Sequence, residues 1–156
     1  MQQIKSVAGA VKPLLLIIIS ASLLSFSMAW GGESFQIYVN NKLVLQQYVS
    51  QNVGVKSIQL DKSAYNEQVD VYYSHCGQPG KNRSITIKDE HNRALKEWHF
   101  ADVAGKNSPM SVKVGEILNI KTKGSNNLNL YYFSQQLPNG RLLASVVAAG
   151  DSKANP

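Results

Sequence analysis

Cysteine and histidine are both scarce in this sequence, which has one cysteine and three histidines among 156 residues. A single cysteine, Cys76, cannot close an internal disulfide, so the disulfide-stapled scaffolds of many small secreted domains are excluded. We expect Cys76 to be a free thiol, buried as a small hydrophobic side chain rather than exposed for pairing with a partner. His75, His91 and His99 lack the spacing of a zinc site. The sequence therefore predicts no metal and no cofactor.

Recognisable catalytic motifs are missing too. The chain has no G-x-S-x-G, no H-E-x-x-H and no glycine-rich phosphate loop. His75 and Cys76 are adjacent, and adjacent strand residues point to opposite faces, so they cannot act as a base and a nucleophile. Whether the protein is an enzyme stays open, with a non-catalytic role favoured. The alternative is a hydrolase whose acids or histidines come from separate strands.

Charge gives no sign of a nucleic-acid partner. Only 17% of the residues are charged, and 16 basic against 10 acidic residues give a formal net charge of +6. The basic residues are scattered singly or in pairs such as Lys121 and Lys123. A mildly basic chain without a basic patch is typical of a solvated surface.

The only long apolar run lies near the N-terminus. Residues 14–24 (LLLIIISASLL) follow Lys5 and Lys12, and small residues precede a possible cut between Ala29 and Trp30. This pattern predicts a secretory signal peptide over residues 1–29. An uncleaved anchor needs about 20 apolar residues, and the bracketing Lys12 and Glu33 leave too few. We expect a periplasmic or secreted protein with no membrane span after cleavage, its formal charge lowered to +4.

The remainder predicts one domain over residues 30–150 and a disordered tail over residues 151–156. Short segments of alternating polarity are separated by turn residues. No later segment has an apolar stripe of helix length, and residues 114–118 fit either a helical turn or the start of a strand. The pattern predicts an all-β fold, a single antiparallel β-sandwich of Ig-like or jelly-roll-like type with about eight or nine strands. The expected strands are 35–39, 43–49, 55–60, 69–75, 84–88, 95–100, 110–114, 128–133 and 142–147.

Doubled tyrosines are the most suggestive feature. In each of the pairs 72–73 and 131–132, one ring is expected in the core and the other on an outer face. Rigid amphipathic tyrosines can form a platform for sugar rings or for a partner protein. The alternative is that tyrosine is simply a good strand former. The candidate platform residues are Tyr72 and Tyr131, with Tyr38 or Tyr48.

The two doubled tyrosines also introduce similar stretches. Each is followed by a turn that contains proline and glycine (Pro79-Gly80 and Pro138-Asn139-Gly140) and then by an arginine, Arg83 in the first stretch and Arg141 in the second. This echo predicts two equivalent hairpins, although coincidence explains it equally well.

With the stretches VYYSHCGQPGKNRSITIKDEHNRALKEWHF and LYYFSQQLPNGRLLASV in place, the chain resembles small exported bacterial proteins of unknown function. The likeness spans roughly Ser34 to Val147. It implies an envelope or secreted setting and a β-sandwich-like domain, and it carries over no functional residue.

The favoured function is therefore an exported, non-catalytic binding or interaction module that takes a protein or glycan partner on a tyrosine-bearing sheet face. The alternatives are an exported hydrolase and a structural envelope subunit that assembles along strand edges. Long unprotected edge strands would favour the last. The oligomeric state stays open.

Overall fold

The structure is a computed structural model that describes residues 32–49, 54–102, 108–121 and 127–148. The expected signal peptide and C-terminal tail lie outside the described residues. In the part that is described, no helix is both long enough and apolar enough to cross a membrane.

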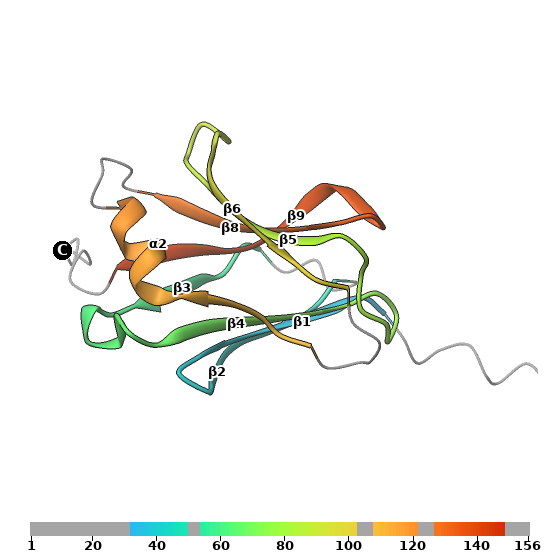
Figure 1. Cartoon of the computed structure of the whole chain (residues 1–156), viewed down its shortest axis with the longest axis horizontal. Helices are drawn as coiled ribbons and strands as arrows, with labels where there is room; N and C mark the ends of the chain where they lie inside the picture. Colours follow the sequence, from blue (N-terminus) through green and yellow to red (C-terminus); the bar gives the residue numbers. More distant parts are fainter. Residues whose placement is uncertain (1–31, 50–53, 103–107, 122–126, 149–156) are drawn as a thin grey trace, which may run out of the picture. The chain divides into compact units, whose positions relative to one another are not determined.

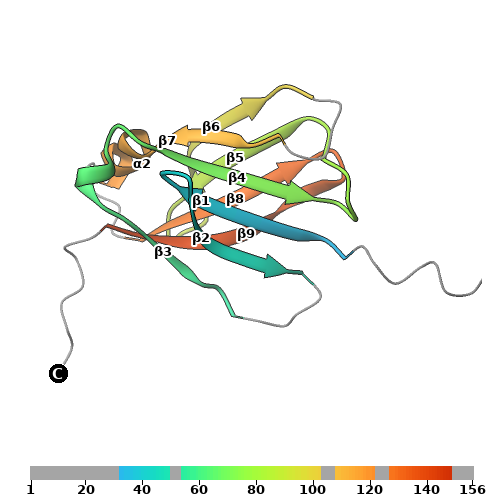
Figure 2. The same ribbon diagram turned by 90° about the horizontal axis from the view of Figure 1, so that it is seen from below.

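The described residues form nine strands in two sheets, so the all-β prediction is confirmed. One sheet has the order β2-β1-β4-β7, and the other has the order β3-β9-β8-β5-β6 (Figures 1 and 2). All pairs are antiparallel except β3 with β9, which is parallel, so the expectation of a purely antiparallel fold is wrong at that pair. The elements are β1 (Ser34–Val39), β2 (Lys42–Tyr48), β3 (Ser57–Leu60), a 3-10 helix η2 (Lys62–Ala64), β4 (Gln68–Ser74), β5 (Arg83–Lys88), β6 (Ala94–Phe100), β7 (Met110–Lys113), α2 (Val114–Lys121), β8 (Leu128–Ser134) and β9 (Leu137–Ala148).

The first hairpin follows directly from its turn residues. Asn40 and Asn41 have φ values of 50° and 58°, which is the left-handed pair that a tight two-residue hairpin turn requires. Asparagine tolerates this conformation better than most residues. The turn therefore sets β2 beside β1, as the sequence predicts.

The expected pair of equivalent hairpins is wrong. β8 and β9 do pair, but β4 belongs to the first sheet and β5 to the second. The β8–β9 turn also differs in position, because Ser134 pairs with Leu137 and only two residues separate them. Residues 138–140 lie inside β9, where Gly140 has a φ of 68° and the Phe133 ring lies against its backbone.

Residues 114–121 form a helix, so the helical alternative for this stretch holds and the helix is longer than expected. Val114, Ile117 and Leu118 are buried at the i, i+3 and i+4 positions of one helix face. Figure 1 shows α2 at one end of the two sheets.

One hydrophobic cluster draws on both sheets. Ile37 and Val71 contribute from the first sheet, and Ile85 and Leu130 contribute from the second; all four side chains are fully buried. Strand alternation produces this arrangement, because every second residue of β4 and β8 faces the same way.

Candidate functional site

Three of the four candidate tyrosines lie on one sheet face. Tyr38 of β1 and Tyr72 of β4 meet edge to face, with ring centroids 5.5 Å apart. Both side chains alternate with buried residues, so they face away from the core. Tyr48 of β2 is paired with Ser34 of β1, and its side chain is 49% exposed.

Tyr131 lies elsewhere, so the expected row that includes it is wrong. It belongs to β8 in the other sheet, where its ring stacks on Phe133 at 6.3 Å. The Lys88 ammonium lies over both rings, 4.6 Å from the Tyr131 centroid and 5.0 Å from the Phe133 centroid. The ring of Tyr131 therefore makes its aromatic and cation–π contacts within its own sheet.

Three shallow hollows follow β1 and β4 on the Tyr38–Tyr72 face. The first, of about 220 Å³, shares Gln36 and Tyr72 with the second, of about 300 Å³. The second shares Asn41 and Asp70 with the third, of about 180 Å³. Because neighbouring hollows share residues, they lie in a row along these two strands, and we call the row the trough.

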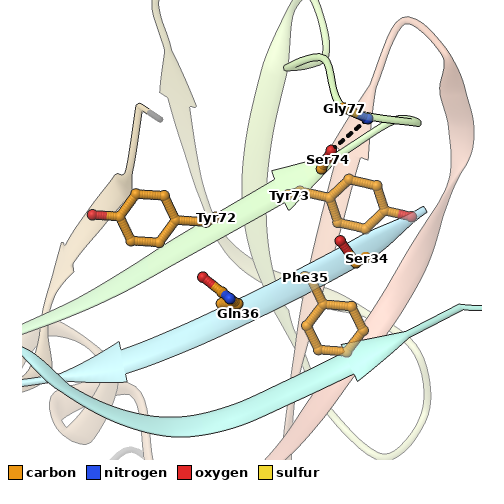
Figure 3. A pocket seen from close by; sticks show the side chains of 7 residues that line it. All are labelled: Ser34, Phe35, Gln36, Tyr72, Tyr73, Ser74 and Gly77. Carbon is orange, nitrogen blue, oxygen red and sulfur yellow. Dashed lines mark hydrogen bonds between the residues drawn. The ribbon is translucent and has the colours of Figure 1, made fainter. Parts of the chain in front are cut away.

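Figure 3 shows the end of the trough nearest the β4–β5 turn. Gln36 and Tyr72 project from neighbouring strands, and Ser74 Oγ accepts a hydrogen bond from the Gly77 amide at 2.8 Å. Tyr72 therefore stands between this hollow and the next one.

The trough carries no positive lining, and its second and third hollows are lined mainly by polar groups. Amide side chains alternate with hydroxyls and with the carboxylates of Glu67 and Asp70. Ser111 Oγ donates to Asp70 Oδ1 at 2.5 Å, and Tyr38 Oη donates to Gln36 Oε1 at 3.3 Å. None of the described residues that line the hollows is basic. The trough can therefore both donate and accept hydrogen bonds, with acidic groups at one end.

A second polar group joins the two sheets, and we call it the inter-sheet clamp. Its centre is a stack of Tyr73 from β4 on Tyr132 from β8, with centroids 4.1 Å apart and rings tilted by 13°. Burial raises the pKa of both phenols above the ordinary value. Both hydroxyls therefore keep their protons and can donate hydrogen bonds. The clamp residues are Glu33, Tyr73, His75, Tyr132, Ser134 and Arg141.

His75 lies between a carboxylate and two hydroxyls. Its Nδ1 is 2.9 Å from Glu33 Oε1, and its Nε2 is 3.0 Å from Tyr132 Oη and 3.1 Å from Ser134 Oγ. A carboxylate oxygen accepts hydrogen bonds, so the Nδ1–H of His75 donates to Glu33 Oε1. In the neutral ring, Nε2 then accepts from one of the two hydroxyls. Arg141 Nη2 completes the group at 3.0 Å from Glu33 Oε2.

The order Glu33, His75, Ser134 is that of the carboxylate, base and nucleophile of serine hydrolases. Ser134 is only 5% exposed, however, and the backbone of Gly80 lies against it. A Cβ at Gly80 would lie 2.8 Å from Ser134 Cβ and 3.0 Å from His75 Nε2. In this arrangement the network satisfies buried polar groups of both sheets and leaves no room at the hydroxyl for a substrate.

The other candidate residues stand apart from both sites. His91 is exposed, and exposed His99 has its Nε2 3.8 Å from Glu97 Oε1. Cys76 is free as expected, but it is exposed, so the expectation of burial is wrong. Its φ of 52° places it in a tight turn outside the strands. Within the described ranges, no three acids, histidines or cysteines gather as metal ligands would.

Sequence reasoning missed Glu33 and Ser134 as partners of His75, and Arg141 as a partner of Glu33. The doubled tyrosines and the echo around them were the available signal, since Tyr73, Tyr132 and Arg141 all belong to it. The signal did not show that β4 and β8 belong to different sheets. Searches of protein families, of curated proteins and of solved structures find no match to this chain.

Proposed function

We propose that this protein is an exported, non-catalytic module that binds a glycan in the trough. The observation that carries the proposal is the Tyr38–Tyr72 pair, which lines the central hollow of the trough together with Gln36, Asn41 and Asp70. The signal-like N-terminus supports export.

We also propose that the two sheets form a single sandwich of immunoglobulin type. Four strand pairings support an immunoglobulin-type strand order. They are β4 with β7, β5 with β8, β8 with β9, and the parallel pair of β3 with β9. The shared hydrophobic cluster and the Tyr73–Tyr132 stack support packing of one sheet on the other. Sandwiches of this type can serve as rigid scaffolds that present binding residues.

The chemistry of the trough favours a glycan over an extended peptide. β1 lies between β2 and β4, and β4 lies between β1 and β7, so neither offers a free backbone edge for strand addition. Recognition must come from side chains. Sugar hydroxyls both donate and accept hydrogen bonds, which matches the amides, hydroxyls and carboxylates, and their C–H faces pack on aromatic rings.

The same lining argues against nucleic acid. Phosphate backbones are bound through lysine and arginine, and none of the described lining residues is basic. Asp70 and Glu67 would repel phosphates instead. A neutral or amine-bearing oligosaccharide fits this charge distribution.

The test is calorimetric titration of the mature protein with cello-oligosaccharides and chito-oligosaccharides. Tyr72→Ala should weaken binding by more than about tenfold, since central aromatic anchors contribute about 2 kcal/mol or more. Tyr131→Ala is the matched control, because it removes the same side chain from the other sheet and should leave affinity unchanged. Equal losses in both variants, or binding of only a protein partner at this face, would refute the glycan proposal.

A hydrolase is the second candidate, and the Glu33–His75–Ser134 geometry is the observation that favours it. It requires Gly80 to move away from Ser134. Labelling of the serine by a fluorophosphonate probe, abolished in Ser134→Ala, would support this candidate. Absence of labelling in a correctly folded sample would remove it.

A further inference from the structure

The central hollow of the trough places one carboxylate beside two aromatic rings. Tyr38 of β1 lies directly opposite Asp70 of β4 in the strand register. The next outward pair consists of Gln36 and Tyr72, whose side chains project from the same two strands (Figure 3). Opposite residues of an antiparallel pair have Cβ atoms about 5 Å apart, and the next residue on the same face lies about 7 Å along the strand. Asp70 is therefore next to Tyr38 across the pair and next to Tyr72 along its own strand.

The geometry of the two rings suits a positively charged group. They meet edge to face, with centroids 5.5 Å apart and planes inclined by 74°. In such a pair, the ring that contributes its edge keeps both of its own faces uncovered by its partner. Ring faces attract cations that lie within about 6 Å of the centroid. A cation bound at Asp70 is therefore within reach of a ring face as well as of the carboxylate.

Asp70 has no positive partner among the residues that the structure describes. Its Oδ1 accepts a hydrogen bond from Ser111 Oγ at 2.5 Å, and none of the ion pairs formed in the described ranges includes it. Lys113 lies on the same strand as Ser111, but its position in the register is opposite Gln68. The carboxylate is thus held in place by a neutral hydroxyl, and its charge is left to a ligand.

From this arrangement we propose that the central hollow binds the protonated amine of an amino sugar, so that the trough selects a glycan with free amines over its N-acetylated counterpart. This inference rests on the proposed function and specifies the class of its ligand. A sugar ammonium donates three N–H groups, which Asp70 and the amide oxygens of Gln36 and Asn41 can accept. Its charge is attracted by the carboxylate and by the ring faces. An N-acetyl group at the same position carries no charge and loses both attractions.

The overall charge of the chain acts against this preference, which makes the preference diagnostic. The chain has a formal net charge of +6 and stays positive after the expected signal cleavage. A positive protein repels a positive ligand at long range. Tighter binding of the free amine therefore requires a local acidic site. The third hollow continues this site, because Glu67 lines it together with Asp70.

The experiment is calorimetric titration of the mature protein at about pH 6, where a sugar amine, like an α-amino group, carries its proton. The two probes are the hexamers of glucosamine and of N-acetylglucosamine, which share one backbone and differ in their acetyl groups. Wild-type protein should bind the glucosamine hexamer about tenfold more tightly, since an exposed ion pair and a cation–π contact each contribute a few-fold.

Asp70→Asn is the variant that tests the carboxylate. It keeps an oxygen that can accept from Ser111, and it should reduce the preference for the free amine to less than about threefold. Glu97→Gln is the matched control, because it removes one carboxylate of 44% exposure from the other sheet. This control should keep the full preference. The comparison of the two hexamers on wild-type protein keeps the test valid if Asp70→Asn misfolds.

Several outcomes would overturn the inference while the glycan proposal stands. One is binding of the N-acetylated hexamer as tightly as the free amine. Another is equal weakening of both hexamers by Asp70→Asn, since the carboxylate would then recognise hydroxyl groups. A third is an equal loss of preference in Glu97→Gln, since overall charge would then be the cause. Failure of wild-type protein to bind either hexamer or a cello-oligosaccharide would instead overturn both proposals.

Discussion

Gly80→Ala is the change that most directly probes the inter-sheet clamp. A Cβ at this position would lie 2.3 Å from Tyr132 Oη, 2.8 Å from Ser134 Cβ and 3.0 Å from His75 Nε2. The Tyr132 ring cannot swing aside, because it is fully buried and stacked on Tyr73. The backbone at Gly80 is outside the left-handed region, so the strain comes from these contacts alone.

The expected cost follows from two effects. Overpacking of a well-packed interior costs about 1–3 kcal/mol, and displacing Tyr132 Oη from His75 loses a hydrogen bond of about 1 kcal/mol. We expect Gly80→Ala to lower the free energy of unfolding by about 3 kcal/mol, which for a domain of this size lowers the Tm by about 10 °C. Urea denaturation should show a lower midpoint with an unchanged slope.

Two further variants make this prediction refutable. Gly54→Ala is the control, because its added Cβ meets nothing within 4 Å, and it should change stability by less than about 0.5 kcal/mol. Tyr132→Phe removes the hydroxyl that obstructs the new methyl group, so the double variant should be more stable than the sum of the single losses by about 1 kcal/mol. Strict additivity, or a neutral Gly80→Ala, would show that this hydroxyl does not fill the space beside Gly80.

Two other predictions concern pH. Burial raises the pKa of the Tyr73 and Tyr132 phenols, so their contribution to stability is complete below about pH 10 and is lost as the pH rises through the folded pKa. Tyr132→Phe should flatten the alkaline loss of stability in urea melts, and an unchanged slope would contradict this. Burial alone would raise the pKa of Asp89, but hydrogen bonds from Arg93 and the His91 amide outweigh it and lower the pKa. The contribution of Asp89 to the free energy of unfolding is therefore complete above about pH 4 and is lost on acidification. The difference in stability between wild type and Asp89→Asn should accordingly close at low pH. A difference that stays constant with pH would refute this prediction.

Local signals account for the parts of the fold that the sequence predicts well. The alternation of Val69, Val71 and Tyr73 with polar or exposed neighbours marks β4, and the structure buries these three residues. The Asn40-Asn41 turn marks the first hairpin. Each of these features depends on residues within a few positions of one another, where side-chain periodicity and turn chemistry act directly.

Pairing between distant strands lies beyond those signals. The turn after β4 has the same composition as a hairpin turn, yet it carries the chain into the other sheet. Turn residues show that the chain can reverse its direction, but they do not show whether the next strand stays in the same sheet. The Pro138–Gly140 stretch shows the same ambiguity, because its glycine serves an irregularity within β9 rather than the turn.

The trough and the clamp both depend on such long-range pairing. Tyr38 and Tyr72 meet because β1 pairs with β4, and Glu33 reaches His75 across 42 positions of sequence. Tyr131, like Tyr72, is the first residue of a Tyr-Tyr pair, yet it lies in the other sheet. The doubled tyrosines therefore mark the strands that contribute to the two sites. They do not show which ring belongs to the trough, which to the clamp and which to neither.

β4 links the two sites, and its alternation separates their roles. Tyr72 lines the central hollow of the trough, while the next residue, Tyr73, borders the first hollow and stacks on Tyr132 in the opposite sheet. Fixing Tyr73 and His75 fixes the end of the strand, and with it the position of Tyr72 and Ser74 along the trough. A loss of stability should therefore follow changes at Tyr73, and a loss of glycan affinity should follow changes at Tyr72, although the two residues are adjacent in sequence. The two neighbours differ because one face of the sheet contributes to the clamp and the other face contributes to the trough.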